Sequence, residues 1–146
     1  MKKTIPIAAD HAGYELKEQL KNVIIALGYN VKDYGTHSLE SMDYPDVVHP
    51  LCQDLIRGEF ELGIIICGSG NGVNITANKY QQIRSALCWN AEIAKLARQH
   101  NNANIIALPA RYISIEEATK AVLSFLETEF EGGRHQNRVN KITTNK

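Results

Sequence analysis

Cys67 is the residue whose setting most favours chemistry. It ends the apolar run 62–67 and directly precedes a glycine-rich turn, 68–72, that opens a predicted helix. The partial positive charge and free N–H groups at a helix N-terminus stabilise a thiolate, which can act as a base or a nucleophile. The alternative is an inert buried thiol, the usual state of a lone cysteine in an apolar strand.

The turn after Cys67 could hold an anion or a developing oxyanion on its backbone N–H groups. It lacks the lysine of a P-loop and the glycine spacing of a dinucleotide-binding turn, so tight packing is an equally good explanation. Its residues are Gly68, Ser69, Gly70, Asn71 and Gly72.

Two histidines are candidates for proton transfer or anion binding. His11 follows Asp10 at the end of a predicted strand, where a simple turn pair is the alternative. His100 ends a predicted helix just before Asn101. The helix dipole there favours a protonated imidazole, which suits a general acid and equally suits a plain C-terminal cap. We predict surface positions for the histidines without a partner pattern: His37, His49 and His135.

The C-terminal arginines are candidates for phosphate binding. Arg134 and Arg138 are four residues apart, so on a helix their guanidinium groups would share one face and could bind one phosphate. A solvated basic face is the alternative, although no acidic residue follows Glu131. Arg111 follows a predicted strand at the carboxyl edge of the sheet and could join the pair.

The other two cysteines, Cys52 in a predicted helix and Cys88 at a strand end, are interpreted as core residues. Neither has metal-ligand spacing with another cysteine or histidine, which argues against a zinc site. Three cysteines are too few, and odd in number, for a disulfide framework. A reducing cytoplasm is therefore the expected compartment.

The elements that position these residues alternate between strand and helix. Predicted strands cover residues 5–9, 29–34, 62–67, 84–88 and 104–108, and predicted helices cover residues 14–27, 46–57, 73–80, 90–100 and 115–130. This alternation predicts an α/β fold with one doubly wound, five-stranded parallel sheet, flavodoxin-like with order 2-1-3-4-5, and helices on both faces. Ligands bind such sheets in the crevice between strands 1 and 3, where Asp10 and Cys67 emerge. The segment after Gly132 suggests a short basic helix that needs a partner surface.

Length and charge narrow the function classes. A chain of 146 residues predicts a single domain, 1–146. The 16 basic and 16 acidic residues cancel, which argues against binding nucleic acid or a membrane surface through overall charge. No apolar run approaches the roughly 18 residues of a membrane span, and the N-terminus has no signal-peptide pattern.

Six motifs follow one another in a specific order. They are Ala-Asp10-His11-Ala-Gly13, Asp43-Tyr44-Pro45, Ile-Cys67-Gly-Ser-Gly-Asn-Gly72, Ala77-Asn78-Lys79, Arg98-Gln-His100-Asn101 and Glu131-Gly-Gly-Arg134-His-Gln-Asn-Arg138. The ordered set resembles the type B ribose-5-phosphate isomerases over nearly the whole chain. Subunits of galactose-6-phosphate isomerase are similar through the cysteine loop but lack counterparts of His100 and of residues 132–138, which favours the pentose enzyme.

This resemblance implies an aldose-ketose isomerase that interconverts ribose 5-phosphate and ribulose 5-phosphate through a cis-enediolate, with no metal and no organic cofactor. Cys67 would carry the proton between C2 and C1, while Ser69 and the N–H groups of the turn would hold the enediolate oxygens. Asp10 and His100 would open the furanose ring. The remaining contacts to the sugar and its phosphate would come from His11, Tyr44, Asn101, Arg111, Arg134 and Arg138.

The resemblance also implies a homodimer, or a tetramer, with a pocket shared between two subunits and with the C-terminal helix reaching the partner. Ser69 stands where threonine is common in the family, and an effect on rate is expected from the lost methyl group. The alternative functions are an isomerase for a six-carbon sugar (allose or galactose 6-phosphate), a non-catalytic phosphosugar-binding module, and a redox thiol protein, which would need a resolving cysteine.

Overall fold

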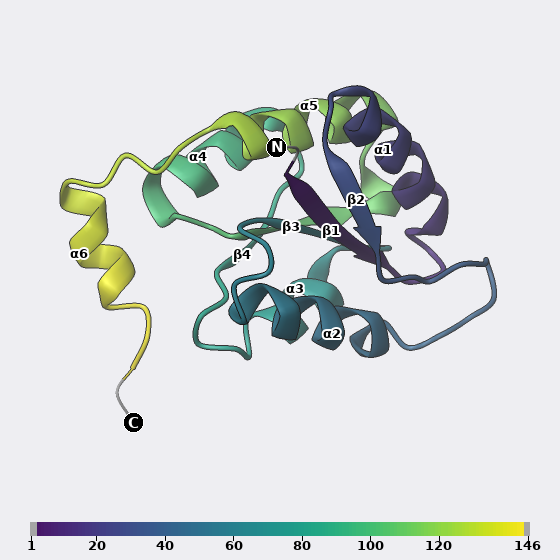
Figure 1. Cartoon of the computed structure of the whole chain (residues 1–146), viewed down its shortest axis with the longest axis horizontal. Helices are drawn as coiled ribbons and strands as arrows, with labels where there is room; N and C mark the ends of the chain where they lie inside the picture. The colour runs from purple at the N-terminus through teal and green to yellow at the C-terminus, as the bar shows by residue number, and fades with distance from the viewer. Residues whose placement is uncertain (1–2, 145–146) are drawn as a thin grey trace.

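The computed structural model describes residues 3–144 and contains a five-stranded, all-parallel sheet between two layers of helices (Figure 1). The strands are β1 (Thr4–Ala9), β2 (Asn30–Asp33), β3 (Gly63–Cys67), β4 (Ser85–Leu87) and β5 (Ile105–Pro109). Their spatial order is β2-β1-β3-β5-β4. The predicted doubly wound parallel sheet is therefore confirmed.

The predicted order of the last two strands is wrong, because β5 and not β4 lies beside β3. The β3–β5 register runs from Gly63 opposite Ile105 to Cys67 opposite Pro109. All five residues of β5 are buried, so this strand needs a neighbour on each side, whereas the three residues of β4 are only half-buried and suit an edge. The crevice between β1 and β3 is unaffected by this exchange.

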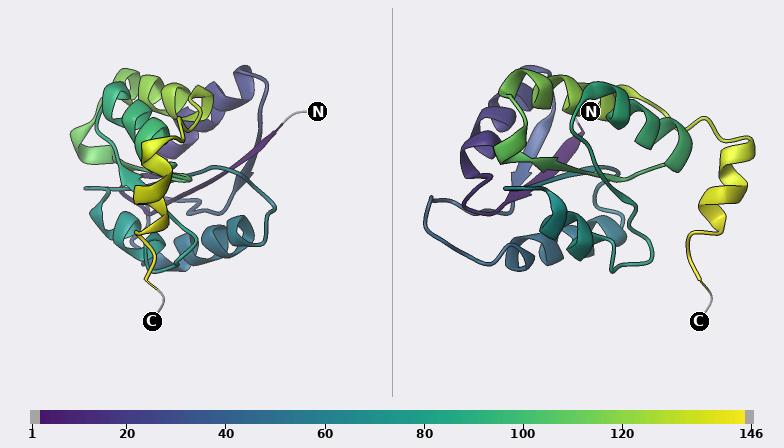
Figure 2. Two further views of the ribbon diagram at one scale, coloured as in Figure 1. Left: turned by 90° about the vertical axis from the view of Figure 1, so that its left-hand side faces the viewer. Right: turned by 180° about the vertical axis from the view of Figure 1, so that it is seen from behind.

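Helices cover both faces of the sheet. One face carries α1 (Tyr14–Ala26), α4 (Ala91–Asn101) and α5 (Ile115–Glu127), and the other carries α2 (Pro45–Ile56) and α3 (Asn71–Ala77) (Figure 2). The side chains of β3 alternate between the two cores: Ile64 and Ile66 face the first layer, and Ile65 and Cys67 face the second. An apolar strand without polar alternation is required here, since both of its faces are buried.

The last helix, α6 (Arg134–Asn140), stands beside the sheet rather than on a face of it (Figures 1 and 2). It contacts α4, and only His135 and Val139 on it are buried. The predicted short helix with a small apolar face is confirmed. Within residues 3–144, no helix has the length and apolar character needed to cross a membrane.

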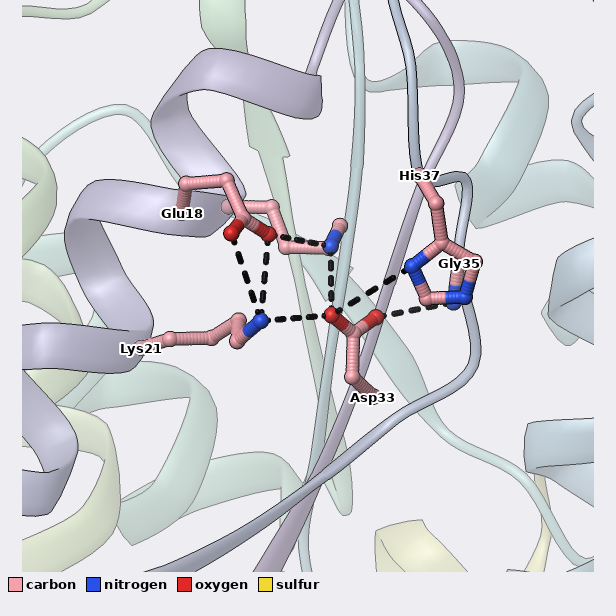
Figure 3. Close-up of polar contacts among 6 residues, drawn as sticks. Glu18, Lys21, Asp33, Gly35 and His37 are labelled. Carbon is pink, nitrogen blue, oxygen red and sulfur yellow. Dashed lines mark hydrogen bonds and ion pairs between the residues drawn. The ribbon is translucent and has the colours of Figure 1, made fainter.

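A partly buried ion cluster ties α1 to the end of β2 (Figure 3). The Lys17 side chain is fully buried, and its Nζ lies 2.7 Å from both Glu18 Oε2 and Asp33 Oδ2. Lys21 Nζ lies 2.7 Å from the same Asp33 oxygen, and the Gly35 N–H donates to Asp33 Oδ1 at 2.8 Å. Burial by itself raises the pKa of Asp33, but the hydrogen bonds from these lysines and from Gly35 lower that pKa below its ordinary value.

This ion cluster also anchors the loop that leaves β2. The Gly35 carbonyl accepts a hydrogen bond from the Ala9 N–H at 2.8 Å, and the Thr36 N–H donates to the Ala9 carbonyl at 2.6 Å. The main chain just before Asp10 is therefore held by the segment that Asp33 fixes.

Candidate active site

A cavity of about 360 Å³ lies where β1, β3 and β5 end. Both polar clusters, the one after β1 and the one after β3, contribute to its wall, so the predicted convergence of these clusters is confirmed. The lining residues are Asp10, His11, Ala12, Tyr44, Cys67, Gly68, Ser69, Gly72, Arg111 and Tyr112.

Cys67 is the last residue of β3, is 4% exposed and lines this cavity. The other two cysteines are fully buried elsewhere in the core, as predicted. Burial raises the pKa of the Cys52 and Cys88 thiols to about 12, so both remain protonated at neutral pH. Cys67 is thus the cysteine that a small molecule in the cavity can meet.

The glycine-rich turn packs tightly against the end of β5. Gly70 has a left-handed φ of 76°, and a Cβ on it would lie 3.2 Å from the main-chain atoms of Leu108 and Pro109. At Gly70, the glycine is therefore required by tight packing, the alternative predicted for this turn from the sequence. Ser69 and Asn71 are exposed, and the Ser69 Oγ accepts a hydrogen bond from the Asn71 N–H at 3.2 Å.

Tyr44 lies directly over the second half of this turn. A Cβ on Gly72 would come within 2.5 Å of Tyr44 Cζ, so the ring can occupy its place only because Gly72 has no side chain. Tyr44 is the N-cap residue directly before α2, which begins at Pro45. Its backbone is thereby fixed beside the cavity.

Asp10 and His11 come from the turn that joins β1 to α1. Asp10 is 7% exposed, and its Oδ1 accepts the Gly13 N–H at 3.1 Å, so the predicted turn-type interaction is present. His11 Nδ1 accepts the Met42 N–H at 3.2 Å. A neutral imidazole that accepts at Nδ1 carries its proton on Nε2. His11 can therefore donate a hydrogen bond from Nε2 to an anion.

Arg111 supplies a positive charge from the third strand end. Its N–H donates to the Gly68 carbonyl at 3.0 Å, and a Cβ on Gly68 would lie 3.3 Å from Arg111 Cδ. The arginine side chain therefore runs over Gly68 along the cavity wall. His11 and Arg111 are the groups of this cavity that can bind a phosphate.

Four of the predicted site residues lie away from the cavity that contains Cys67. His100 and Asn101 are at the C-terminal end of α4, and Arg134 and Arg138 are exposed on α6. A helix between two parallel strands runs against them, so it ends at the sheet edge opposite the strand carboxyl ends. Figure 1 shows β1 and β2 pointing away from α6. Asn101 lines a different cavity of about 440 Å³, together with Arg84 and Ile142.

His135 is buried, so its predicted surface position is wrong. Its ring stacks on His100 with centroids 4.3 Å apart, and its Nε2 lies 3.4 Å from Glu131 Oε1. His49 is half-buried, with Nδ1 2.6 Å from Tyr80 Oη, so its surface position is only partly as predicted, and His37 is exposed as predicted. Residues 35 positions apart in sequence form the His100–His135 pair, so local spacing gives no signal for it.

An acid–base site of this size at the switch point of a doubly wound sheet is typical of an enzyme for a small anionic substrate. The family model described as Ribose/Galactose Isomerase matches residues 5–142, and the chain belongs to this family.

Similar proteins of known name share almost the whole chain. The chain is 40% identical over 141 residues to ribose-5-phosphate isomerase B of Escherichia coli (strain K12), covering 97% of this chain and 95% of that protein. It is 43% identical over 143 residues to a probable ribose-5-phosphate isomerase B of Mycoplasma pneumoniae, covering 97% and 94%.

Solved structures agree with the fold. A ribose 5-phosphate isomerase from Thermotoga maritima matches with a TM-score of 0.94 at 48% identity, covering 97% of this chain and 98% of that one. Ribose-5-phosphate isomerase B from Mycoplasma genitalium, solved with bound ribulose-5-phosphate, matches with a TM-score of 0.91 at 40% identity, covering 97% and 95%.

Proposed function

We propose that this protein interconverts ribose 5-phosphate and ribulose 5-phosphate. The observation that carries the proposal is the position of Cys67, the one cysteine among residues 3–144 that lines the cavity at the strand carboxyl ends, beside a turn of exposed polar groups. Its setting in a member of the ribose/galactose isomerase family supports proton transfer on a sugar phosphate. The relative solved with bound ribulose-5-phosphate supports the pentose as substrate.

In the proposed reaction, the Cys67 thiolate removes the proton from C2 of the open-chain aldose and returns it to C1. The proton of the C2 hydroxyl moves to the C1 oxygen, so that the aldehyde becomes an alcohol and C2 becomes a ketone. The Ser69 hydroxyl and the N–H groups of Gly70, Asn71 and Gly72 stabilise the negative charge of the enediolate. Tyr44, over Gly72, contacts the sugar.

His11 and Arg111 bind one side of the phosphate in this proposal, and Asp10 and His100 open the furanose ring, one receiving and one donating a proton. The second group of residues, His100, Asn101, Arg134 and Arg138, completes the pocket from another copy of the chain. The geometry that supports a shared pocket is their position at the opposite edge of the sheet. The exposed apolar side chains of Ile75, Trp89 and Tyr112 supply surface that a second chain can cover.

We assign the protein to the cytoplasm. All three cysteines are free thiols, which suits a reducing compartment.

The direct test is turnover of ribose 5-phosphate in deuterated water. We expect ribulose 5-phosphate to form and solvent deuterium to enter the sugar, because the thiol exchanges its proton with water during part of the turnovers. A higher kcat/KM for allose or galactose 6-phosphate would make a six-carbon sugar the substrate. If ribose 5-phosphate binds without turnover and without deuterium exchange, the protein is instead a non-catalytic phosphosugar-binding module.

The shared pocket predicts complementation between two inactive variants. A Cys67→Ala chain and a His100→Ala chain, each nearly inactive alone, should regain about a quarter of wild-type activity when unfolded, mixed in equal amounts and refolded together. Half of the dimers are then mixed, and each mixed dimer has one pocket with both residues intact. Steady-state assays before and after mixing measure the effect.

The control is the same procedure with each variant alone, which must stay inactive. A mixture that also stays inactive would place Cys67 and His100 of the same chain in one pocket, whereas a His100→Ala chain that is fully active alone would remove His100 from the site.

A further inference from the structure

Three potential metal ligands converge between α4 and α6, outside the cavity that contains Cys67. They are His100, Glu131 and His135. Glu131 Oε1 lies 3.9 Å from His100 Nε2 and 3.4 Å from His135 Nε2, and one ligand atom from each residue lies within 4.8 Å of the others.

The main chain holds these residues together. The Glu131 N–H donates to the Gln99 carbonyl at 3.1 Å, which fixes Glu131 beside the end of α4. Gly132 and Gly133 then have φ of 71° and 55°, a conformation that other residues rarely adopt. They turn the chain back so that α6 begins with His135 in its first turn. The cluster is therefore built by the fold rather than by flexible surface side chains alone.

Two imidazoles and one carboxylate are a ligand set that proteins use for Zn²⁺, whereas Mg²⁺ and Ca²⁺ prefer oxygen ligands. With bonds of about 2.0–2.1 Å, tetrahedral zinc holds its ligand atoms roughly 3.3 Å from one another. The distances from Glu131 Oε1 are already 3.4 and 3.9 Å.

The two rings are stacked with an angle of 13° between their planes, so one ring must turn before both nitrogens point to a single ion. The side chain of His100 is 41% exposed and can make this rotation, while that of His135 is only 10% exposed and acts as the fixed ligand. Glu131, 50% exposed, leaves a path for the ion. Water can fill the fourth position.

We propose that His100, Glu131 and His135 form a binding site for Zn²⁺, and that the bound ion inhibits the enzyme. The inhibitory effect rests on the proposed function, in which His100 moves a proton during ring opening. A zinc ion on His100 Nε2 occupies the lone pair that would carry that proton. The positive charges of Arg134 and Arg138 on the same helix oppose cation binding, so we expect affinity in the micromolar range rather than that of a structural zinc site.

Binding can be measured without any activity. We would titrate Cys67→Ser protein with ZnCl2 by calorimetry in a phosphate-free buffer, because this background removes the thiol as a competing ligand. One Zn²⁺ per chain is expected. Loss of even an outer partner of a metal ligand costs about 10–100-fold in affinity, so adding Glu131→Gln should weaken binding at least tenfold.

The matched control is Glu129→Gln in the same background, which removes a nearby exposed carboxylate outside the cluster and should leave the affinity unchanged. The proposal is overturned if no saturable binding occurs up to about 1 mM Zn²⁺, a concentration well above the expected micromolar affinity and far above that of structural zinc sites. It is equally overturned if Glu131→Gln binds as tightly as its parent.

The inhibitory effect is tested separately on the chain with Cys67 intact. ZnCl2 should lower its isomerase activity, EDTA should restore it, and Glu131→Gln should need at least about tenfold more zinc for half-inhibition. Full activity at saturating zinc would overturn the inhibitory role. Zinc binding in a chain that does not isomerise ribose 5-phosphate would instead contradict the proposed function and leave the metal site intact.

Discussion

Replacing Cys67 with alanine is expected to lower kcat for ribose 5-phosphate by about 10²–10⁴-fold, the usual contribution of a general acid–base group. The alanine cannot remove the C2 proton, while the groups assigned to the phosphate and to the enediolate oxygens stay in place. The substrate should therefore still bind. Cys67→Ser should show a similar loss, because a serine hydroxyl is a much weaker acid than a thiol and is seldom ionised at neutral pH. Steady-state kinetics and a direct measurement of substrate binding distinguish the two effects.

Cys52→Ala is the matched control for this prediction. Cys52, on α2, belongs to the same apolar core as Cys67 but is fully buried away from the cavity, and burial keeps its thiol protonated by raising its pKa to about 12. Its replacement should cost stability and leave kcat within a few-fold of wild type. A Cys67→Ala protein with near-normal turnover would remove the thiol from the reaction.

Replacing Lys17 with methionine is expected to destabilise the fold by about 3 kcal/mol at neutral pH, as when one partner of a buried ion pair is removed. Asp33 keeps a negative charge but loses Lys17, the fully buried cation of the cluster; of the two lysines only Lys21 remains beside it. Urea unfolding of the variant and wild-type proteins measures this difference in the free energy of unfolding.

The loss should depend on pH in a defined direction. The ion cluster lowers the pKa of Asp33, so its ionised form stabilises the fold above the ordinary pKa of about 3.9, and this contribution is lost as the pH falls through the lower value in the folded protein. The difference between wild type and Lys17→Met should therefore be full at pH 7 and shrink in strong acid. A difference that is constant over this range would contradict the electrostatic cause.

Two further variants separate charge from packing. Lys120→Met, on the exposed face of α5, should change the free energy of unfolding by no more than about 0.5 kcal/mol. The double variant Lys17→Met, Asp33→Asn should recover part of the loss, because it no longer leaves a carboxylate with reduced compensation.

The elements and the first half of the site could be predicted from local sequence. A strand without polar alternation that ends at Cys67, followed by a glycine-rich turn, predicts both the buried β3 and a polar group at its carboxyl end. Parallel strands bring such ends to one edge, so the meeting of His11 with Cys67 follows from topology alone.

Other features depend on contacts between distant parts of the chain. The observed order places β5, and not β4, beside β3 because burying the more apolar strand between two neighbours removes more apolar surface from water. All of β5 is buried, whereas β4 is only half-buried at the edge. The burial of His135 depends on a loop that brings it onto His100, and no periodicity within α6 encodes that contact. The resemblance to type B ribose-5-phosphate isomerases adds the expectation that His100 and Arg138 belong to the same pocket as Cys67, contributed by a second chain, and this expectation stays a prediction.

The turn after Cys67 places its hydrogen-bond donors in the main chain, where Gly70 leaves no room for a side chain and Gly72 lies under Tyr44. Peptide N–H groups do not titrate in the range where proteins are folded. The part of the cavity proposed to stabilise the enediolate therefore has the same strength in acid and in base. Any bell-shaped dependence of the rate on pH must come from the thiol, the carboxyl group, the imidazoles and the phosphate of the substrate, which leaves few candidates for each limb of the curve.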